Sequence, residues 1–289
     1  MPNSQRKTQN AKLLILLLLL LYGCGQGSGV AQSSPQATAL VPTAYLPTVV
    51  RAEQWWRPAP GLRWQWQLTE APIDQSVDAQ VFDIDYEVDA ETVAQLRAAG
   101  RRTICYINVG AWEEWRPDAA QFPPEVIGKE YTGWPGERWL DIRQIDTLAP
   151  LMQARLDICK AKGFDGVEPD NIDGYHADTG FPLTRADQLA YLRWLAREAH
   201  ARGLSIGQKN SPELAAELQP DFDWALTESC FAQGWCEQMQ PFLAAGKAVF
   251  AAEYTESGIT TAQFCAGARR LGISAILKHL ELGVYRESC

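Results

Sequence analysis

Polar side chains end most of the short apolar runs in this sequence. Glu168 and Asp170 close one run, and Glu228 closes another further along the chain. One acid in such a position is readily explained as a helix cap, but acids or amides at the end of nearly every run are harder to explain in that way. Two facing carboxylates can attack a sugar carbon and protonate a leaving oxygen, which is the chemistry of glycosidic bond hydrolysis. The polar strand-end candidates are Asp83, Asp85, Asn108, Glu168, Asp170, Asn171, Lys209, Asn210, Glu228, Glu253, Tyr254 and Lys278.

Eight apolar runs alternate with longer amphipathic segments, which predicts repeated β-α units around a parallel sheet. Glycines follow several of the helical segments, where they commonly end helices. The pattern therefore predicts an α/β protein with a single (β/α)8 TIM-type barrel. The expected strands are 64–68, 79–85, 103–110, 166–171, 205–210, 224–229, 248–254 and 274–279. The expected helices are 89–99, 146–162, 185–201, 211–218, 238–245 and 260–271.

In a barrel of this kind, the active site forms at the carboxyl ends of the strands. Side chains along a strand alternate between the barrel interior and the helix layer, so Glu168 and Asp170 share one face of their strand. Asp170 and Glu228 end the fourth and sixth strands, and alternate strands contribute to a common layer. We therefore expect these two carboxylates to face each other, and a separation of about 5 to 5.5 Å would indicate a retaining mechanism. The alternative is a solvated pair of acids without a catalytic role.

The longest connection, residues 111–140, carries four tryptophans together with several prolines and glycines. A connection of this length inside a compact domain is usually functional. Its tryptophans are expected either to stack on sugar rings or to cover the mouth of the barrel. They are Trp112, Trp115, Trp134 and Trp139.

Five segments of the chain resemble glycoside hydrolase family 114, the endo-α-1,4-polygalactosaminidases. They are 64–68 (WQWQL), 134–143 (WPGERWLDIR), 167–175 (VEPDNIDGY), 179–184 (TGFPLT) and 207–210 (GQKN). The similarity extends from about Trp55 to Cys289. It implies a (β/α)8 barrel that hydrolyses α-1,4-linked galactosamine polymers with retention, and it places the catalytic carboxylates at Asp170 and Glu228.

By analogy with related retaining barrels, Asp170 is expected to be the nucleophile and Glu228 the acid/base, and the reverse assignment stays open. Lys209 and Lys278 are expected to orient the carboxylates or to bind ring hydroxyls, with structural pairing as the alternative. An amino sugar that is not acetylated carries an ammonium group, and the expected countercharges are Asp83, Asp85, Asp141, Glu168, Asp173 and Glu253. The remaining expected substrate contacts are Trp66, Tyr106, Asn108, Trp112, Asn171, Tyr175, Asn210 and Tyr254.

Three functions are compatible with these residues. The favoured one is an endo-acting retaining glycosidase, because only an enzyme requires both Asp170 and Glu228. The alternatives are a surface-anchored carbohydrate-binding barrel without turnover and an α-galactosidase-like exo-glycosidase. No cofactor or metal is expected, since the histidines are scattered singly, and a net charge of −9 argues against nucleic acid as a partner. We expect a monomer.

The first residues have the features of an export signal. Arg6, Lys7 and Lys12 precede an apolar run at 13–22, which is shorter than the roughly 20 residues that a membrane span needs. The sequence around Cys24 resembles a bacterial lipobox, so a lipid anchor at Cys24 is expected, with simple cleavage as the alternative. We predict a signal peptide at 1–23, a polar tether at 24–52 and the barrel at 53–289. The protein is then extracytoplasmic, either secreted or lipid-anchored at the cell envelope.

Six further cysteines form an even set in a chain that is expected to be exported, which predicts disulfides. Six cysteines allow fifteen pairings. Proximity favours Cys230 with Cys236, and a staple for the last helix would join Cys265 to Cys289. Cys105 and Cys159 remain for the third pair, with two buried free thiols as the alternative.

Overall fold

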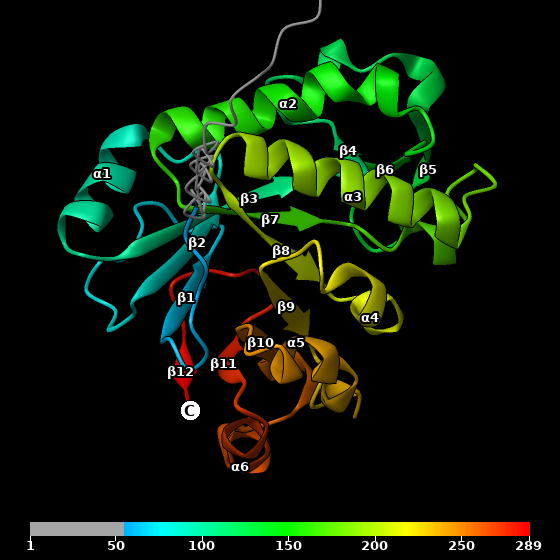
Figure 1. Cartoon of the computed structure of the whole chain (residues 1–289). Coiled ribbons are helices and arrows are strands. Elements are labelled where there is room, and N and C mark those ends of the chain that lie inside the picture. The colour runs from blue at the N-terminus through cyan, green and yellow to red at the C-terminus, as the bar shows by residue number, and fades with distance from the viewer. Residues whose placement is uncertain (1–54) are drawn as a thin grey trace, which may run out of the picture. The chain divides into compact units, whose positions relative to one another are not determined.

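Eight parallel strands form the framework of this computed structural model, which describes residues 55–289 (Figure 1). Each strand pairs with the next parallel strand along the chain, in the order β1-β2-β3-β7-β8-β9-β10-β11. All eight strands predicted from the sequence are confirmed. Their bounds are β1 Trp64–Gln67, β2 Val81–Asp85, β3 Arg102–Asn108, β7 Gly166–Asp170, β8 Ser205–Lys209, β9 Trp224–Glu228, β10 Val249–Tyr254 and β11 Ser274–Lys278.

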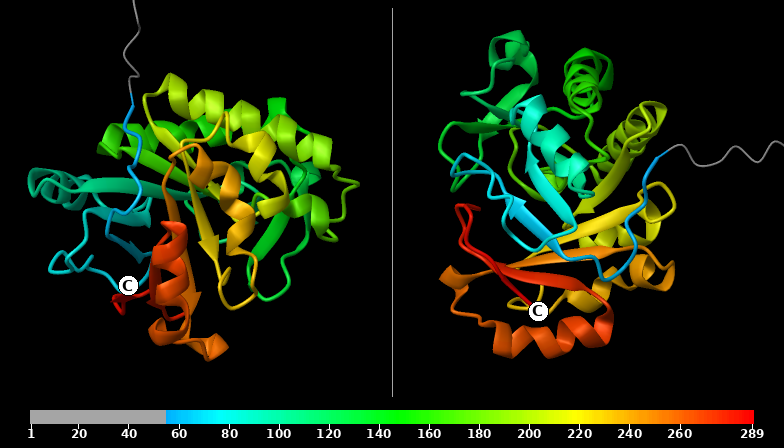
Figure 2. Two further views of the ribbon diagram at one scale, coloured as in Figure 1. Left: turned by 60° about the horizontal axis from the view of Figure 1, so that its bottom comes forward. Right: turned by 90° about the vertical axis from the view of Figure 1, so that its left-hand side faces the viewer.

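The parallel sheet is curled, with the helices on its outside (Figure 2). Within the described residues, no ladder joins the two edge strands, β1 and β11, directly. The C-terminal segment bonds to both of them instead. Its strand β12 (Glu287–Ser288) pairs antiparallel with β11, while Arg286 Nε donates to the carbonyl of Trp64 at 2.7 Å and Leu68 N–H donates to the carbonyl of Leu282 at 2.9 Å. The last residues of the chain therefore contact both edge strands of the sheet.

Six α-helices follow six of the eight parallel strands, and among the described residues none follows β1 or β11. Two of the expected helices, at 211–218 and 238–245, begin as 3₁₀ turns. Pro241 lacks an N–H and is tolerated only in the first helical turn, so α5 starts immediately before it. The helices are α1 Ala90–Ala98, α2 Ile145–Lys162, α3 Arg185–Ala201, α4 Ala215–Leu218, α5 Gln240–Ala244 and α6 Thr261–Leu271. The 3₁₀ turns are Ala119–Gln121, Pro124–Val126, Gly174–His176, Pro212–Leu214, Cys236–Met239 and Thr255–Ser257.

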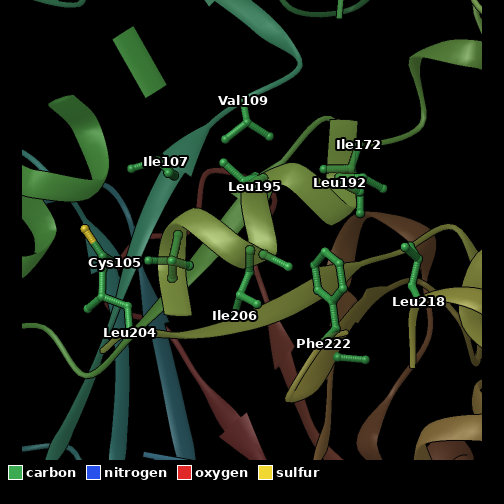
Figure 3. Close-up of a cluster of buried hydrophobic side chains, with 14 of the residues drawn as sticks. Cys105, Ile107, Val109, Ile172, Leu192, Leu195, Leu204, Ile206, Leu218 and Phe222 are labelled. Carbon is green, nitrogen blue, oxygen red and sulfur yellow. The ribbon is translucent and has the colours of Figure 1, made fainter. Parts of the chain in front are cut away.

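Two apolar layers hold the sheet in place. The inner layer contains Trp64, Trp66, Trp224 and Phe250, whose side chains fill the inside of the curl. The outer layer packs the strands against the helices, and Figure 3 shows part of it, with side chains from β3, β8 and α3 gathered between sheet and helix. Because the inside is filled with indole and phenyl rings, the inward polar side chains are concentrated at the carboxyl ends of the strands.

The long connection between β3 and α2 contains regular structure that the sequence analysis did not anticipate. Strands β4 (Ala111–Glu113), β5 (Ile127–Glu130) and β6 (Glu137–Leu140) form a small antiparallel sheet in the order β4-β6-β5. The turn between β5 and β6 uses Gly133 and Gly136, whose φ angles of 94° and 89° favour glycine. This small sheet brings additional side chains to the carboxyl ends of β3 and β7.

Three disulfides are present, and their pairs are the three that the sequence predicted. Cys105–Cys159 joins β3 to α2, Cys230–Cys236 closes the loop after β9, and Cys265–Cys289 ties the end of the chain to α6. The alternative of two free thiols at Cys105 and Cys159 is therefore wrong.

The chain enters the described part at the amino-terminal ends of the strands. Trp55 stacks on His200 with ring centroids 4.1 Å apart, and its indole N–H donates to Asp223 Oδ1 at 3.1 Å. His200 lies in the last turn of α3 and Asp223 directly precedes β9, so both belong to the end of the sheet opposite the strand carboxyl ends.

Residues 1–54 are not described, so the predicted signal peptide, the tether, Cys24 and the start of the barrel at residue 53 lie outside the described residues. Within 55–289, no helix is both long and apolar enough to span a bilayer.

Candidate active site

A buried lysine lies at the centre of the strand carboxyl ends. Lys209, at the end of β8, donates from Nζ to Glu168 Oε1 at 2.9 Å and to Asp170 Oδ1 at 2.8 Å, and it lies 3.1 Å from Glu228 Oε2. Its side chain is only 3% exposed and lies over the ring of Trp66. Burial alone would lower the pKa of Lys209, but the carboxylates of Asp170, Glu168 and Glu228 outweigh burial and raise that pKa well above its usual value. Lys209 is therefore a permanent cation that three carboxylates share.

This lysine also limits the distance between the two predicted catalytic acids. A single nitrogen lies 2.8 Å from Asp170 Oδ1 and 3.1 Å from Glu228 Oε2. The two oxygens are therefore within about 6 Å of each other, which is close to the ~5 to 5.5 Å of retaining glycosidases and shorter than the ~6.5 to 9.5 Å of inverting ones. The side chains of Asp170 and Glu228 remain 19% and 26% exposed, so both are accessible to a ligand.

Asp170 is held in its ionised form. The Tyr106 hydroxyl donates to Oδ2 at 2.8 Å, while Lys209 donates to Oδ1. Burial would raise the pKa of Asp170, but the charge of Lys209 and these hydrogen bonds outweigh it and keep the pKa below its usual value. A carboxylate in this state is available as a nucleophile at neutral pH.

Glu228 is oriented by two neighbouring side chains. Asn210 Nδ2 donates to Glu228 Oε2 at 2.9 Å, and Asn210 Oδ1 accepts the backbone N–H of Glu228 at 2.8 Å. The hydroxyl of Tyr254, from β10, donates to Glu228 Oε1. Asn210 and Tyr254, two of the expected substrate contacts, therefore both bind the side chain of Glu228.

The backbone turns sharply where β7, β8 and β9 end. Asn171, Asn210, Ser211 and Ser229 have φ angles of 60°, 45°, 50° and 55°, in the left-handed region that non-glycine residues rarely adopt. Such strain collects at functional sites. Gly110 belongs to the same arrangement, because a Cβ there would lie 1.6 Å from the carbonyl oxygen of Asn171. Only glycine permits the chain after β3 to lie against the end of β7.

Two residues of the small sheet reach this site, and the sequence analysis did not select either of them. Glu137 accepts hydrogen bonds from Asn108 Nδ2 at 3.2 Å and Asn171 Nδ2 at 3.3 Å. Burial, followed by the charges of Glu113 and Asp170, raises the pKa of Glu137 to about 7. Glu137 lies in the segment 134–143, which resembles the family. That resemblance was the one feature of the sequence that could have indicated Glu137 as a site residue.

Tyr131 is the second such residue. Burial, together with the charges of Asp173, Asp170 and Glu228, raises the pKa of Tyr131, so its hydroxyl lies in the field of these three carboxyl groups. Its ring lies 4.3 Å from that of Trp139. Asp173 is half-buried in the loop after β7, and burial together with the charge of Asp170 raises its pKa.

Two expected site acids form the floor beneath this cluster. Asp83 and Glu168 are completely buried, and burial is the largest cause of the raised pKa of each. The pKa of Glu168 is raised to about 7. Because neither side chain reaches the surface, they act on the site only through their neighbours.

Three other expected countercharges are bound elsewhere. Asp85 forms an ion pair with Arg116 at 2.8 Å, and Asp141 forms one with Arg143 at 2.7 Å. Glu253 accepts the backbone N–H groups of Phe231 and Ala232, in the loop after β9. Tyr254 is directed toward Glu228, so its neighbour Glu253 faces the opposite side of β10. The structure therefore does not bring these three acids to the catalytic carboxylates.

Four further candidates also have structural partners. Lys278 donates to the carbonyl of Gly283 at 2.7 Å and to Gln65 Oε1 at 3.2 Å, with no bond to a carboxylate among the described residues. The Trp112 indole donates to the carbonyl of Ala119, and the Tyr175 hydroxyl donates to Glu213. Trp66 is buried in the inner layer and offers no exposed ring face.

One group of potential metal ligands occurs in the described residues, namely Cys230, Cys236 and Glu253. The two sulfurs are joined in a disulfide, and the carboxylate binds two backbone N–H groups. Metal binding by cysteine requires thiolates, so this group does not offer a metal site in the oxidised protein.

A curled parallel α/β sheet with two accessible carboxylates bridged at its carboxyl ends is typical of glycoside hydrolases. The family model described as glycoside-hydrolase family GH114 matches residues 46–289. The chain belongs to glycoside hydrolase family 114 and is a glycoside hydrolase, as the sequence analysis predicted.

Three individual proteins resemble this chain. The chain is 30% identical over 207 residues to an uncharacterised protein of Deinococcus radiodurans, a match that covers 69% of this chain and 66% of the relative, slightly under two thirds. A crystal structure of Aspergillus fumigatus Ega3 in complex with galactosamine is 38% identical, with a TM-score of 0.77 over 81% of this chain and 97% of Ega3. The glycoside hydrolase domain of PelA from Pseudomonas aeruginosa shares the fold, with a TM-score of 0.63 over 80% of this chain and 98% of the domain, at 16% identity.

Proposed function

We propose that this protein is a retaining glycoside hydrolase that cleaves α-1,4-linked galactosamine-containing polysaccharide, with Asp170 as nucleophile and Glu228 as acid/base. The observation that carries the proposal is the bridge through Lys209 Nζ, which lies 2.8 Å from Asp170 and 3.1 Å from Glu228. The resulting carboxylate separation suits retention. The similarity to Ega3, whose structure contains galactosamine, supports the choice of sugar.

In the first chemical step, a carboxylate oxygen of Asp170 forms a bond to the anomeric carbon while the bond to the leaving oxygen breaks. Glu228 gives its proton to that oxygen. In the second step, a water molecule attacks the anomeric carbon, its proton passes to Glu228, and the ester to Asp170 breaks. Two inversions at one carbon restore the original configuration.

The environments of the two acids support this division of roles. Asp170 receives hydrogen bonds from Tyr106 and Lys209, and its pKa lies below the usual value, as a nucleophile requires. Glu228 has the more exposed side chain and lies on a different strand, β9, where it can reach the leaving oxygen.

The charge of the site supports an amino sugar as substrate. Even with Glu228 protonated as the acid, the carboxylates of Asp170 and Glu168 outnumber the single positive charge of Lys209, and Asp173 is half-buried near Asp170. An ammonium group on the sugar would balance part of this negative charge. Asp173 and Glu137 replace Asp85, Asp141 and Glu253 as the proposed countercharges.

We also propose that the eight parallel strands form a barrel of the (β/α)8 type, although helices follow only six of them in the described residues. The contacts of the C-terminal segment with β1 and β11 support closure. Three disulfides indicate an oxidising, extracytoplasmic compartment.

We further propose that a lipid on Cys24 attaches the protein to the cell envelope. Cys24→Ser is expected to move the protein from the membrane fraction to the soluble fraction of a bacterial host. Retention of this variant in the membrane fraction would show that Cys24 is not the attachment point.

The activity test measures reducing-end release from deacetylated α-1,4-linked galactosamine polymer. The wild type is expected to release reducing ends whose newly formed anomers are initially α, as seen by NMR. Glu228→Gln is expected to be inactive, whereas Glu237→Gln, the same change at an exposed position on the Cys236–Met239 turn, is expected to be active. Binding without release by the wild type would favour a carbohydrate-binding barrel, and release of single sugars only would favour exo action.

A further inference from the structure

Two carboxyl groups beneath the catalytic pair have no visible partner for most of their oxygens. Asp83, on β2, and Glu168, on β7, are completely buried and lie within hydrogen-bonding reach of each other. Among the described residues, neither oxygen of Asp83 and only one oxygen of Glu168 has a hydrogen-bonding partner. Three buried acceptor oxygens are therefore left together in the interior.

Two adjacent carboxylates cannot both stay ionised in such a place. Each charge would be desolvated, and the two would repel each other. Among residues 55–289, the cation that binds the pair is Lys209, which contacts Glu168 Oε1 but is already shared with Asp170 and Glu228. A single proton between the two acids removes one charge and supplies the missing donor, as in other pairs of carboxyl groups that share a site.

The surroundings indicate which acid carries this proton. Glu168 Oε1 accepts a hydrogen bond from Lys209, which stabilises an ionised Glu168. Asp83 receives no such bond, and its pKa is raised well above the usual value by burial and by the neighbouring Glu168. A protonated Asp83 then donates a hydrogen bond to Glu168 Oε2, and Glu168 Oε1 continues to accept the hydrogen bond from Lys209.

We propose that Asp83 and Glu168 hold one proton between them, carried by Asp83, and that the ionised Glu168 positions Lys209 between Asp170 and Glu228. The shared proton follows from the structure of the site alone, whereas the positioning role rests on the proposed function. Asp83 and Glu168 are positioning residues, since neither reaches the substrate.

Other charged and titratable groups surround the pair on several strands. They contribute to any measured pH profile, so a test must separate the pair from them. These groups are Tyr106 on β3, Asp170 on β7, Lys209 on β8, Glu228 on β9 and Tyr254 on β10.

The first test compares two substitutions of Asp83. Asp83→Asn replaces a neutral acid by a neutral amide that can still donate to Glu168 Oε2, so both limbs of the kcat/KM pH profile are expected to stay within about 0.3 units of the wild type. Asp83→Leu removes the donor, and kcat is expected to fall by about tenfold or more. Rescue by Asn would show that the donor, and not only the shape of the side chain, is required.

The opposite result for Asp83→Asn would overturn the proposal. If Asp83 were ionised in the wild type, the substitution would remove a negative charge close to the acid/base. Proton loss from the acid/base would become easier, and the alkaline limb would move to lower pH by roughly one unit.

The second test needs no substrate, so it separates this proposal from the proposed function. Infrared spectra of the wild type at pH 8 are expected to contain the carbonyl band of a protonated carboxylic acid, and Asp83→Asn is expected to lack it. Asp85→Asn is the control on the same strand and should keep the band, because Asp85 is ion-paired with Arg116. If the wild type and Asp83→Asn have the same carbonyl bands, Asp83 does not carry a proton. This conclusion holds even if Asp83→Leu fails to fold.

Discussion

The two proposed catalytic carboxylates share the charge of Lys209 but differ in their other partners. Asp170 accepts hydrogen bonds from Lys209, at 2.8 Å, and from the Tyr106 hydroxyl. Glu228 accepts bonds from the Asn210 amide and the Tyr254 hydroxyl and lies 3.1 Å from Lys209. Charged donors favour the ionised form of an acid more strongly than neutral donors do. The hydrogen-bonding partners of Asp170 therefore support its proposed role as the nucleophile.

Rescue by azide tests which acid is the nucleophile. With an activated aryl α-glycoside of a galactosamine oligomer, Glu228→Ala plus azide is expected to give the α-glycosyl azide, because the covalent intermediate on Asp170 still forms and azide replaces water. Asp170→Ala plus azide is expected to give the β-glycosyl azide by one direct displacement. NMR gives the configuration of each product. A β-glycosyl azide from Glu228→Ala and an α-glycosyl azide from Asp170→Ala would establish the reverse assignment.

Tyr106→Phe is expected to change the acidic limb of the pH profile. The Tyr106 hydroxyl stabilises ionised Asp170, so its removal raises the pKa of Asp170. Activity that needs ionised Asp170 is then lost at a higher pH, and the acidic limb of kcat/KM moves up by roughly one unit. The control is Tyr285→Phe, which removes a similar bond to the exposed Glu287. A limb that stays in place for Tyr106→Phe would contradict the role of this hydroxyl.

Much of the cluster at the strand ends could be predicted from the sequence, and the differences have physical reasons. The grouping of Asp170, Glu228 and Lys209 was predictable because each is the last residue of its strand. The alternation of side chains along β10 would have excluded Glu253, since Tyr254 points inward. Asp85 could not be excluded in this way, because its partner Arg116 comes from the long connection and no sequence periodicity indicates that contact.

At the scale of elements, the small sheet β4-β6-β5 adds chemistry to the framework. It supplies Tyr131 and Glu137 at one side of the site and leaves Trp115 and Trp134 at the surface, 53% and 46% exposed. Trp115 lies against Gly136, in the turn that leads into β6. Of the two readings of these tryptophans, stacking on sugar rings fits Trp115 and Trp134, whereas Trp112 and Trp139 are packed in the structure.

Trp134→Ala is expected to lower kcat/KM for long polymer by about two- to fivefold, since an exposed indole facing an ammonium-bearing sugar contributes about 0.5 to 1 kcal/mol. Hydrolysis of the shortest oligomers that are cleaved should change less, because their sugars bind at the carboxylates and do not extend as far as Trp134. Ile158→Ala, a truncation at an exposed position of α2, is the control. An equal loss on long and short substrates would argue against a contact with outlying sugars.

The sequence predicts the strands better than the connections. Strands of the parallel sheet are buried on both faces and appear as continuous apolar runs. The strands β4, β5, β6 and β12 have two to four residues each, which is too short for a periodic pattern. The contact of the C-terminal segment with β1 depends on single backbone hydrogen bonds, such as that from Leu68 N–H to the carbonyl of Leu282. Such bonds do not require particular side chains, so the sequence does not predict them.

At the scale of the whole molecule, the three disulfides constrain the chain to different extents. Cys105–Cys159 spans 54 residues between β3 and α2, whereas Cys230–Cys236 spans only 6. In the chain-entropy account, a longer closed loop restricts the unfolded state more strongly. The disulfide under the helix layer should therefore contribute more to global stability than the one in the loop.

Replacing both Cys105 and Cys159 by Ala is expected to lower the free energy of unfolding by about 4 kcal/mol, against about 2 kcal/mol for the Cys230 and Cys236 pair. Urea unfolding of both double variants beside the wild type measures the two changes. Equal losses would show that native packing around the sulfurs, and not loop length, determines their contributions.

Trp55 and the proposed catalytic carboxylates lie at opposite ends of the parallel strands. Trp55 is fixed on His200 and Asp223, at the amino ends of the strands, while Asp170 and Glu228 lie at the carboxyl ends. The first described residue therefore lies on the side of the sheet opposite the proposed catalytic carboxylates. Polysaccharide bound across Asp170 and Glu228 would then lie at the end of the strands away from Trp55.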